Sequence, residues 1–314
     1  MILDWFSATF WSLLCALIID RVVGEPKSWH PLIWFGAWVD SARLFIQKPL
    51  DSVIKGQKVA GALAWGLAVL PWVFVLLTLF CTLSSSLSWV LSTGVLYFCI
   101  GWQSLREHAQ AIETPLLKGN FKEARDAVGK IVSRDTDTLT ESEISKASIE
   151  SVLENGSDAV FAPIFWFVML GAPGVLIYRL ANTLDAMWGY KTEELINFGW
   201  FAARADDVLN FIPARLVVYT YALCGALHGN ATRARRCARR QSLYWKSPNA
   251  GPVMAAGAGA LGLKLGGDAV YFGKTETRPI LGEGREPNVQ DIAASIQLVD
   301  RGVVVWVILV LILI

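Results

Sequence analysis

Charged side chains are scarce in this 314-residue sequence, where Asp, Glu, Lys and Arg together make up 18% of the residues. Ordinary soluble domains carry about 25%. The segment Val59–Leu105 lacks charge altogether over 47 consecutive residues. A bilayer-spanning helix needs about 20 apolar residues, so this segment is long enough for two crossings. Together with a mean hydropathy of +0.44, this excludes an ordinary soluble globular domain and indicates a multi-pass membrane protein.

Cysteine pairs with metal-ligand spacing are absent as well. The five cysteines include no Cys-x-x-Cys pair, and four of them lie in apolar segments. We therefore expect neither a disulfide framework nor a zinc site.

Several apolar segments predict membrane helices. Val59–Cys81 and Leu87–Leu105 are expected to form a helical hairpin with its turn at Ser84–Ser86. Trp5–Ile19 is expected to be a membrane anchor, because it lacks the basic start and the small-residue cleavage site of a signal peptide. The tail from residue 303 to 314 is short for a crossing unless its helix begins earlier, near Asp291.

Two further segments leave the number of crossings open. Ala159–Tyr178 has 20 uncharged residues, but Gly171–Gly174 contains the Gly and Pro residues that break helices. A re-entrant or interfacial helix pair is therefore the alternative to a crossing. Val208–Leu227 is similarly ambiguous because Arg215 lies in its middle. We expect an all-α, polytopic membrane protein with four or five membrane helices, with a re-entrant helix pair as a variant of this fold.

Polar blocks separate the apolar segments and suggest a topology. Arg21–Lys58 has six basic and three acidic residues, and His228–Ser247 has six basic residues and no acidic one. The positive-inside rule places such loops in the cytoplasm, and the hairpin then returns Arg106–Asp158 to the same side. We expect one integral membrane domain over residues 1–314. It would carry a helical cytoplasmic insertion at 106–158 and a basic, Gly/Ala-rich cytoplasmic or interfacial region at 228–290. Thr140-Glu-Ser-Glu143 has the capping-box pattern of a helix start.

Three motifs resemble sequences that bind nucleotides or nucleic acid, but the residues around them do not support that function. Gly257–Gly262 matches the GxGxxG dinucleotide fingerprint, but a run of Ala and Gly surrounds it, which is more typical of closely packed membrane helices. Gly273-Lys274-Thr275 resembles the end of a P-loop but lacks the required earlier glycine. The basic run Arg233–Arg240 lies next to membrane segments, where a topology determinant or a contact with anionic lipid is favoured over nucleic acid. A more specific alternative is that this basic run binds a polyanionic substrate.

An acidic stripe marks the start of the Ala159–Tyr178 segment. Glu150, Glu154 and Asp158 are spaced four apart, so an uninterrupted helix would present them on one face, with Asn155 beside them. Like charges at this spacing repel each other, and Mg²⁺ would relieve the repulsion. The alternative is a solvated acidic face.

Other ionisable groups gather at the ends of apolar segments, where they favour a functional site. Arg179, Asn182 and Asp185 lie on one side of a predicted helix, which directly follows the Ala159–Tyr178 segment. The remaining groups of this kind are Asp20, Arg21, Glu25, His30, Arg134, Arg204, Asp206, Asp207, Asn210 and Arg215.

Taken together, these segments resemble the CobD/CbiB family, the adenosylcobinamide-phosphate synthases of cobalamin biosynthesis. The matching pieces are Asp20–Pro26 with His30-Pro31, Ser133–Asp137, Glu150–Asn155 with Asp158 and Ala162-Pro163, Tyr178–Asp185 with Gly189-Tyr190, Phe198–Trp200, Arg204 with Asp206-Asp207, Pro213–Arg215, Ser247–Gly251, Leu265–Gly267 and Tyr271–Gly273. Their order and spacing over roughly 250 residues carry the resemblance. One position departs from the pattern: Met254 stands where the family usually has Glu.

The resemblance implies an amide-forming ligase. A carboxylate of adenosylcobyric acid would be joined to (R)-1-aminopropan-2-ol, or its O-phosphate, with consumption of ATP in the presence of Mg²⁺. On this basis Glu150, Glu154, Asp158 and Asp185 are expected to hold the metal, and Glu154, Asp185, Asp206 and Asp207 to be catalytic. Asp206 or Asp207 would deprotonate the amine. The expected substrate-binding residues are Asp20, Arg21, His30, Arg134, Asn155, Arg179, Asn182, Arg204, Arg215 and Asn249.

The implied setting is the bacterial inner membrane, with the active face in the cytoplasm and no nucleic acid among the partners. Other membrane enzymes of cobalamin assembly are candidate partners. Two other functions stay open at this point: a non-enzymatic, AmpE-like membrane sensor and a corrinoid-related transporter. The absence of an inverted repeat in the sequence argues against the transporter.

Overall fold

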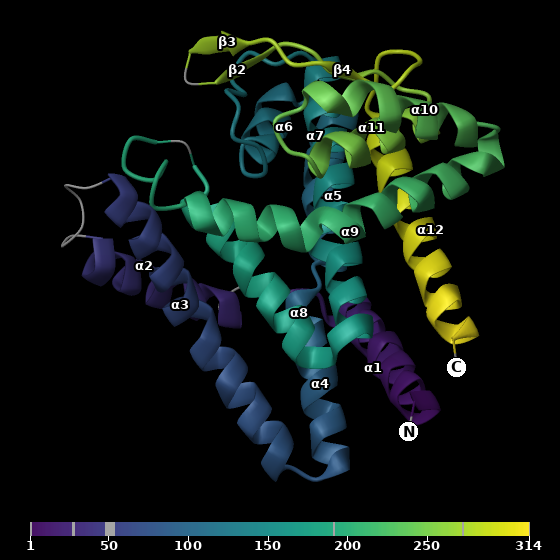
Figure 1. The fold of residues 1–314 in the computed structure, drawn as a ribbon. Helices are drawn as coiled ribbons and strands as arrows, with labels where there is room; N and C mark the ends of the chain where they lie inside the picture. The colour runs from purple at the N-terminus through teal and green to yellow at the C-terminus, as the bar shows by residue number, and fades with distance from the viewer. Residues whose placement is uncertain (1, 27–28, 48–53, 191, 272, 314) are drawn as a thin grey trace. The chain divides into compact units, whose positions relative to one another are not determined.

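The computed structural model describes residues 2–26, 29–47, 54–190, 192–271 and 273–313. Helices dominate these residues, and the strands are four short segments in two antiparallel pairs (Figure 1). The chain divides into two compact units. Unit 1 comprises Met1–Gly101, Ala162–Asn210 and Leu313–Ile314, and unit 2 comprises Trp102–Phe161 and Phe211–Ile312.

Unit 1 is a helical assembly whose core lies between three helices. Its helices are α1 (Ile2–Val23), α2 (Pro31–Gln47), α3 (Ile54–Thr82), α4 (Ser85–Cys99), α8 (Ala162–Trp188) and the first part of α9 (Trp200–Gly225). Small side chains at Ala60, Ala64 and Ala68 form a buried stripe on α3. This stripe lets α3 pack closely against α2 and α8, as small residues do in membrane helix interfaces.

The predicted hairpin is present, but its second arm is shorter than expected. The turn lies at Leu83–Ser84, and α4 ends at Cys99 rather than Leu105 because Ile100 adopts extended backbone. Gly101 follows, and glycine disfavours helix. A new helix, α5 (Trp102–Leu117), then begins and belongs to unit 2. Both arms pack on α8, and each has one further partner, α2 for α3 and α1 for α4.

Helix α8 folds back on itself at Gly171. This glycine has φ 66° and ψ −157°, a backbone conformation essentially restricted to glycine. Trp166 Nε1 donates to the carbonyl oxygen of Leu209 at 3.1 Å, and Tyr178 Oη donates to Asn210 Oδ1 at 2.9 Å. In a straight helix residues 166 and 178 would lie about 18 Å apart, yet they contact successive residues of α9. The predicted helix break is therefore confirmed, and the arm at 162–170 rises only about 14 Å, less than a bilayer's hydrocarbon core.

Unit 2 is built around α7 (Glu141–Gly156), which packs against α5, α11 and α12. The capping box predicted at its start is confirmed by reciprocal hydrogen bonds between Thr140 and Glu143. A π-helical turn, Ser157–Phe161, follows α7. The other elements are α6 (Phe121–Val128), the rest of α9, α10 (Ala231–Gln241), α11 (Ala250–Leu261), β1 (Leu265–Gly266), β2 (Ala269–Tyr271), β3 (Lys274–Glu276), β4 (Ile280–Leu281) and α12 (Gln290–Ile312).

The GxGxxG match lies inside α11, as the packing interpretation predicts. A Cβ added to Gly257 would come within 2.5 Å of the Leu153 side chain, and one added to Gly259 within 2.8 Å of the Ala234 backbone. These glycines therefore let α11 approach α7 and α10 closely.

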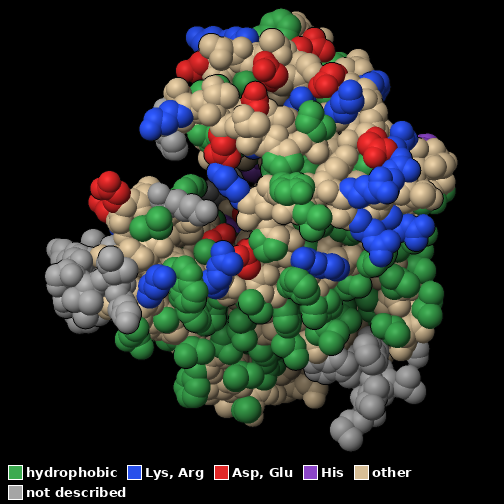
Figure 2. All heavy atoms as spheres, turned by 45° about the horizontal axis from the view of Figure 1, so that its top comes forward, with side chains coloured by type: hydrophobic (Ala, Val, Ile, Leu, Met, Phe, Trp, Pro, Cys, Tyr) green, Lys and Arg blue, Asp and Glu red, His purple; other side chains and the backbone are tan. Residues whose placement is uncertain are grey.

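Among the described residues, five helical stretches are long and apolar enough to cross a membrane, in agreement with the predicted four or five. They are Gly56–Thr82, Ser85–Leu117, Glu141–Trp188, Trp200–His228 and Gln290–Ile312. The second includes α4 and α5, and the third runs from α7 through α8. The last begins next to Asp291, which makes the C-terminal helix long enough for a crossing. Figure 2 shows broad areas of hydrophobic side chains on the surface, and Leu63, Leu67 and Leu70 of α3 are exposed.

Candidate functional site

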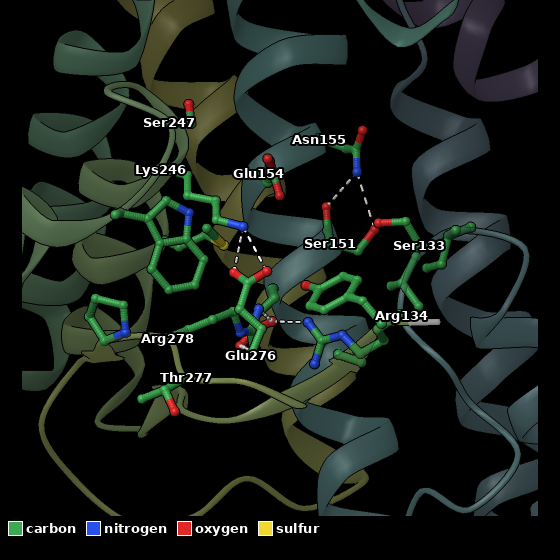
Figure 3. Close-up of a pocket in the computed structure, with 18 of the residues that line it drawn as sticks. Ser133, Arg134, Ser151, Glu154, Asn155, Lys246, Ser247, Glu276, Thr277 and Arg278 are labelled. Atoms are coloured by element: carbon green, nitrogen blue, oxygen red, sulfur yellow. Dashed lines mark hydrogen bonds and ion pairs between the residues drawn. The ribbon is translucent and has the colours of Figure 1, made fainter. Parts of the chain in front are cut away.

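A polar cavity of about 650 Å³ lies within unit 2 (Figure 3). Its walls come from α7, the loop before it, the turn before α11 and the β2–β3 hairpin. The lining residues that carry polar or aromatic groups are Ser133, Arg134, Glu150, Ser151, Glu154, Asn155, Tyr244, Trp245, Lys246, Ser247, Tyr271, Glu276, Thr277 and Arg278. Met254, the position that departs from the family pattern, also lines this cavity and is 2% exposed.

Glu150 is held between two arginines at the wall of the cavity. Arg134 donates to Oε2, Arg278 donates to both carboxylate oxygens at 3.1 and 3.3 Å, and the Gly266 N–H donates to Oε1 at 2.7 Å. All three charged side chains are less than 10% exposed. Because both oxygens of Glu150 accept hydrogen bonds from protein groups, this carboxylate serves a structural role. The expectation that Glu150 binds a metal ion stays a prediction.

Only part of the predicted acidic stripe reaches the cavity. Glu154 and Asn155 line the cavity, whereas Asp158, which lies in the π-helical turn, does not and is within electrostatic reach of buried Tyr221. Asp185 belongs to unit 1. Among the residues that the structure describes, no group of three or more His, Cys, Asp or Glu side chains could hold a metal ion. A metal site formed by Glu150, Glu154, Asp158 and Asp185 stays a prediction.

The charges that line the cavity are balanced. Three basic side chains, Arg134, Lys246 and Arg278, face three acidic ones, Glu150, Glu154 and Glu276. Lys246 Nζ contacts the two oxygens of Glu276 at 2.6 and 2.7 Å, and Figure 3 shows this pair beside the cavity. Arg278 also lies 5.2 Å from the Trp245 ring centre. A cavity with paired charges, hydroxyl and amide groups and aromatic rings suits an uncharged polar ligand better than a polyanion.

Arg215 and Asn249 form one structural contact behind the turn that enters α11. Arg215 Nη1 donates to Asn249 Oδ1 and to the Phe211 carbonyl, and Nη2 donates to the Pro248 carbonyl at 3.1 Å. The ring of Phe211 lies 3.8 Å from the guanidinium carbon. The two residues hold the turn that carries Ser247, which itself lines the cavity. The substrate-binding role expected for both stays a prediction.

Unit 1 brings together the predicted carboxylates of α8 and α9. Asp206 accepts from Asn182 at 3.1 Å and from Asn210 at 3.0 Å, one on each oxygen. Asp207 pairs with Arg204 at 3.2 Å. Asp185 lies within electrostatic reach of Asp206, Asp207 and Arg204. The structure thus brings Asn182 and Asp185 of α8 close to Arg204, Asp206 and Asp207 of α9, while the catalytic and binding roles expected for them stay predictions.

Arg179 takes a different direction from Asn182 and Asp185, although all three lie on α8. It lines an apolar cavity of about 240 Å³ together with Phe98 and Cys99 of α4, and it is near enough to affect the charge of His30. The prediction that one face of the helix carries all three groups is wrong for Arg179. The helix rotates by about 100° per residue, so a spacing of six separates the two ends of the set by about a third of a turn.

The N-terminal motif residues have structural contacts in unit 1. Asp20 is 1% exposed and Arg21 lies in the last turn of α1. His30 Nδ1 accepts from the Leu32 N–H at 3.2 Å, and its Nε2 lies 3.7 Å from Glu25. His30 thus caps α2, whose first residue is Pro31. Burial lowers the pKa of His30, and so does Arg179, while Glu25 opposes the shift.

The sequence alone did not single out several cavity residues. Arg278, Trp245 and Glu276 carry no recognisable motif, and Arg278 contacts Glu150 across 128 residues of sequence. The family pieces Ser247–Gly251 and Tyr271–Gly273 lie close to them in the sequence but do not include them.

Comparisons with known proteins show the family of this chain. The family model described as CobD/Cbib protein matches residues 13–299. The chain belongs to the CobD/CbiB family. It is 48% identical to the cobalamin biosynthesis protein CobD of Stutzerimonas stutzeri (strain A1501), over 97% of each chain. It is 48% identical to the protein of the same name from Chromobacterium violaceum, over 96% of this chain and 94% of that one. Identity to the cobalamin biosynthesis protein CbiB of Salmonella typhimurium is 34%, over 90% of each chain. No solved structure shows a significant match.

Proposed function

We propose that this CobD/CbiB protein acts in cobalamin biosynthesis as a ligase, adenosylcobinamide-phosphate synthase. It joins a side-chain carboxylate of adenosylcobyric acid to the amine of (R)-1-aminopropan-2-ol or its O-phosphate. The carboxylate first takes the terminal phosphoryl group of ATP, which releases ADP. The amine then attacks the acyl phosphate, the new C–N bond forms, inorganic phosphate leaves, and one amine proton passes to a base.

The cavity of unit 2 is the observation that carries this proposal. Its walls bring together pieces of the family pattern that are far apart in sequence, namely Ser133-Arg134, Glu150–Asn155 and Ser247. Its balanced charge and its hydroxyl, amide and aromatic groups suit a large ligand rich in uncharged amides, which describes the periphery of a corrinoid. A volume of about 650 Å³ lies within the usual range for small-molecule sites.

Glu154 supplies the base in this proposal. It lines the cavity, and we assign it to accept the amine proton. A carboxylate within hydrogen-bond reach of an attacking amine can act as a general base. In unit 1, Asn182 and Asn210 engage the two oxygens of Asp206, and the catalytic roles expected for Asp185, Asp206 and Asp207 stay predictions.

The fit of a resident Mg²⁺ is poor among the described residues. Glu150 is engaged by two arginines, and no group of three or more potential ligands is present. We therefore assign no step to a metal held by the protein alone. ATP is a co-substrate in this scheme. The Mg²⁺ requirement that we expect is that of the nucleotide, whose phosphates complete the coordination of the ion.

The test is an assay with purified protein in detergent, using adenosylcobyric acid, aminopropanol or its phosphate, and ATP with Mg²⁺. The expected product is a corrinoid heavier by the amine less one water, formed with equimolar phosphate release and only in the arm that contains ATP. Corrinoid binding is followed separately by its visible absorbance. Asn155→Ala should weaken this binding about tenfold, the effect of about one lost hydrogen bond, and Glu154→Gln should abolish turnover while binding persists. A folded protein that gives no product with either amine would refute the proposal.

The same assay separates the alternatives. A non-enzymatic, AmpE-like sensor or a corrinoid-related transporter would form no amide in detergent, and a transporter would carry corrinoid into sealed vesicles. We place the protein in the bacterial inner membrane with its active face in the cytoplasm, from the basic loops of the sequence. Other membrane enzymes of cobalamin assembly are candidate partners, because they would handle the same amphipathic corrinoid.

A further inference from the structure

Helix α10 of unit 2 presents a strongly basic face to the surface. Four arginines, Arg235, Arg236, Arg239 and Arg240, are exposed and fall within one arc of the helix. The opposite arc, with Ala234, Cys237 and Ala238, is buried against α11. Arg236 pairs with Glu283, so the face keeps a clear positive excess. Figure 2 shows clusters of basic side chains of this kind on the surface.

Helix α12 indicates the depth at which α10 lies. From Gly302 to Ile312 this helix has no charged residue, and it exposes Val304, Ile308 and Leu309. The apolar part starts directly after Asp300 and Arg301. Trp102 Nε1 donates to Asp300 at 2.9 Å, and tryptophan is enriched at membrane–water interfaces. Unit 2 therefore meets the polar surface of the bilayer at the level of Asp300–Arg301.

The start of α10 lies at the same level. Arg301 Nη1 is 3.2 Å from Nε2 of His228, and α10 begins three residues later, at Ala231. Deeper in the membrane, Trp306 Nε1 donates to Thr220 Oγ1 of α9 at 2.8 Å. The chain thus leaves the apolar region along α9, passes His228 at the interface and enters the basic helix.

Exposed apolar side chains flank the basic face on both sides. Leu227, just before α10, is 72% exposed, and Leu243 and Tyr244, just after it, are 76% and 80% exposed. Large apolar groups next to an arginine cluster match a surface with anionic headgroups above hydrocarbon. A nucleic acid offers phosphate charge but no apolar layer for these three side chains.

We propose that the exposed face of α10, with Leu227, Leu243 and Tyr244, binds acidic phospholipids of the membrane in which α12 lies. The arginines contact the headgroup phosphates, and the flanking side chains enter the acyl boundary. None of the four arginines lines the cavity of unit 2, whereas Tyr244 does.

The test uses full-length protein in a neutral detergent and measures the thermal unfolding midpoint during titration with phosphatidylglycerol. Phosphatidylcholine and soluble glycerol phosphate form parallel arms. We expect phosphatidylglycerol to raise the midpoint and the other two additives to have little effect. Arg235→Gln/Arg239→Gln/Arg240→Gln should increase the half-saturating lipid concentration about a hundredfold, since each basic residue near an anionic surface contributes about a fivefold change.

The matched control is Lys118→Gln/Lys122→Gln/Lys130→Gln, which removes three exposed positive charges elsewhere in unit 2. It should respond to phosphatidylglycerol like the wild type. A second variant, Leu227→Ser/Leu243→Ser, should weaken the lipid response without a change of charge and without altering a cavity residue. An equal response to phosphatidylcholine, an equal loss in the lysine control, saturation by glycerol phosphate alone, or preferential binding of an oligonucleotide would each overturn the proposal.

Discussion

At the scale of single residues, Glu150 shows why a conspicuous acidic side chain need not be catalytic. Its place in a four-residue repeat suggested a metal ligand, but two arginines and one backbone N–H engage it. The partner Arg278 is invisible in the sequence because nothing local marks a contact across 128 residues. Glu154, one turn later, lines the same cavity and keeps its candidacy for the chemistry.

Glu150→Gln should therefore destabilise the protein rather than act on catalysis alone. Removing the charge leaves two buried arginines without their carboxylate, which costs about 3–5 kcal/mol. The measurement is denaturant unfolding in detergent. Glu276→Gln is the control, because its partner Lys246 is 70% exposed, and a pair of this kind contributes below about 1 kcal/mol. Equal losses in the two variants would contradict the structural role of Glu150.

His30 should make stability depend on pH. Burial holds its pKa below the ordinary value of 6.5, so the folded state favours the neutral ring. The stability due to the neutral ring is complete above pH 6.5 and is lost as the pH falls below that value, because the unfolded chain then binds more protons. Wild type should lose more of its unfolding midpoint between pH 7.5 and 5.5 than His30→Asn. Asparagine keeps an N-cap acceptor for α2 but does not titrate. Equal losses of the unfolding midpoint in wild type and His30→Asn would contradict this role of His30.

At the scale of elements, local patterns predicted those features that depend on local physics. The uncharged run predicted the helix α3, and the capping box predicted the start of α7. A helix that begins near Asp291 was the condition for the C-terminal tail to cross the membrane, and α12 begins there. The π-helical turn at Ser157–Phe161 could not be foreseen, because no residue spacing in the sequence marks an i→i+5 turn. Asp158 lies in that turn and does not line the cavity.

A substitution at Gly171 tests whether α8 needs its bend. Its φ of 66° with ψ −157° is accessible essentially to glycine alone, so Gly171→Ala should cost about 1–3 kcal/mol. Gly94→Ala in α4 is the control, since an added Cβ there meets nothing within 4 Å. Alanine is favoured over glycine in a helix by about 1 kcal/mol. Unfolding of both variants in detergent measures the difference, and an unchanged Gly171→Ala protein would mean that α8 does not require this bend.

At the scale of the whole molecule, the family pattern divides between the two units. The Ser133–Asp137, Glu150–Asn155 and Ser247–Gly251 pieces belong to unit 2, and the Tyr178–Asp185 and Asp206-Asp207 pieces to unit 1. Apolar segments predicted the membrane class of the fold, because hydropathy is a property of each segment alone. They could not predict this division, since the boundaries fall within continuous helical stretches near residues 161 and 210.

The charge distribution predicts that the α3–α4 turn faces the periplasm. The basic blocks Arg21–Lys58 and His228–Ser247 favour the cytoplasm, and α3 is long enough to cross once between them and the turn. A cysteine at Ser84 should then react with a membrane-impermeant maleimide in intact cells. A cysteine at Lys130 should react only after lysis. Cys81→Ser is needed as background, because Cys81 is exposed. Cys237 should stay unlabelled, since burial raises its pKa to about 11. Labelling of Lys130→Cys in intact cells would reverse the orientation and with it the cytoplasmic placement of the active face.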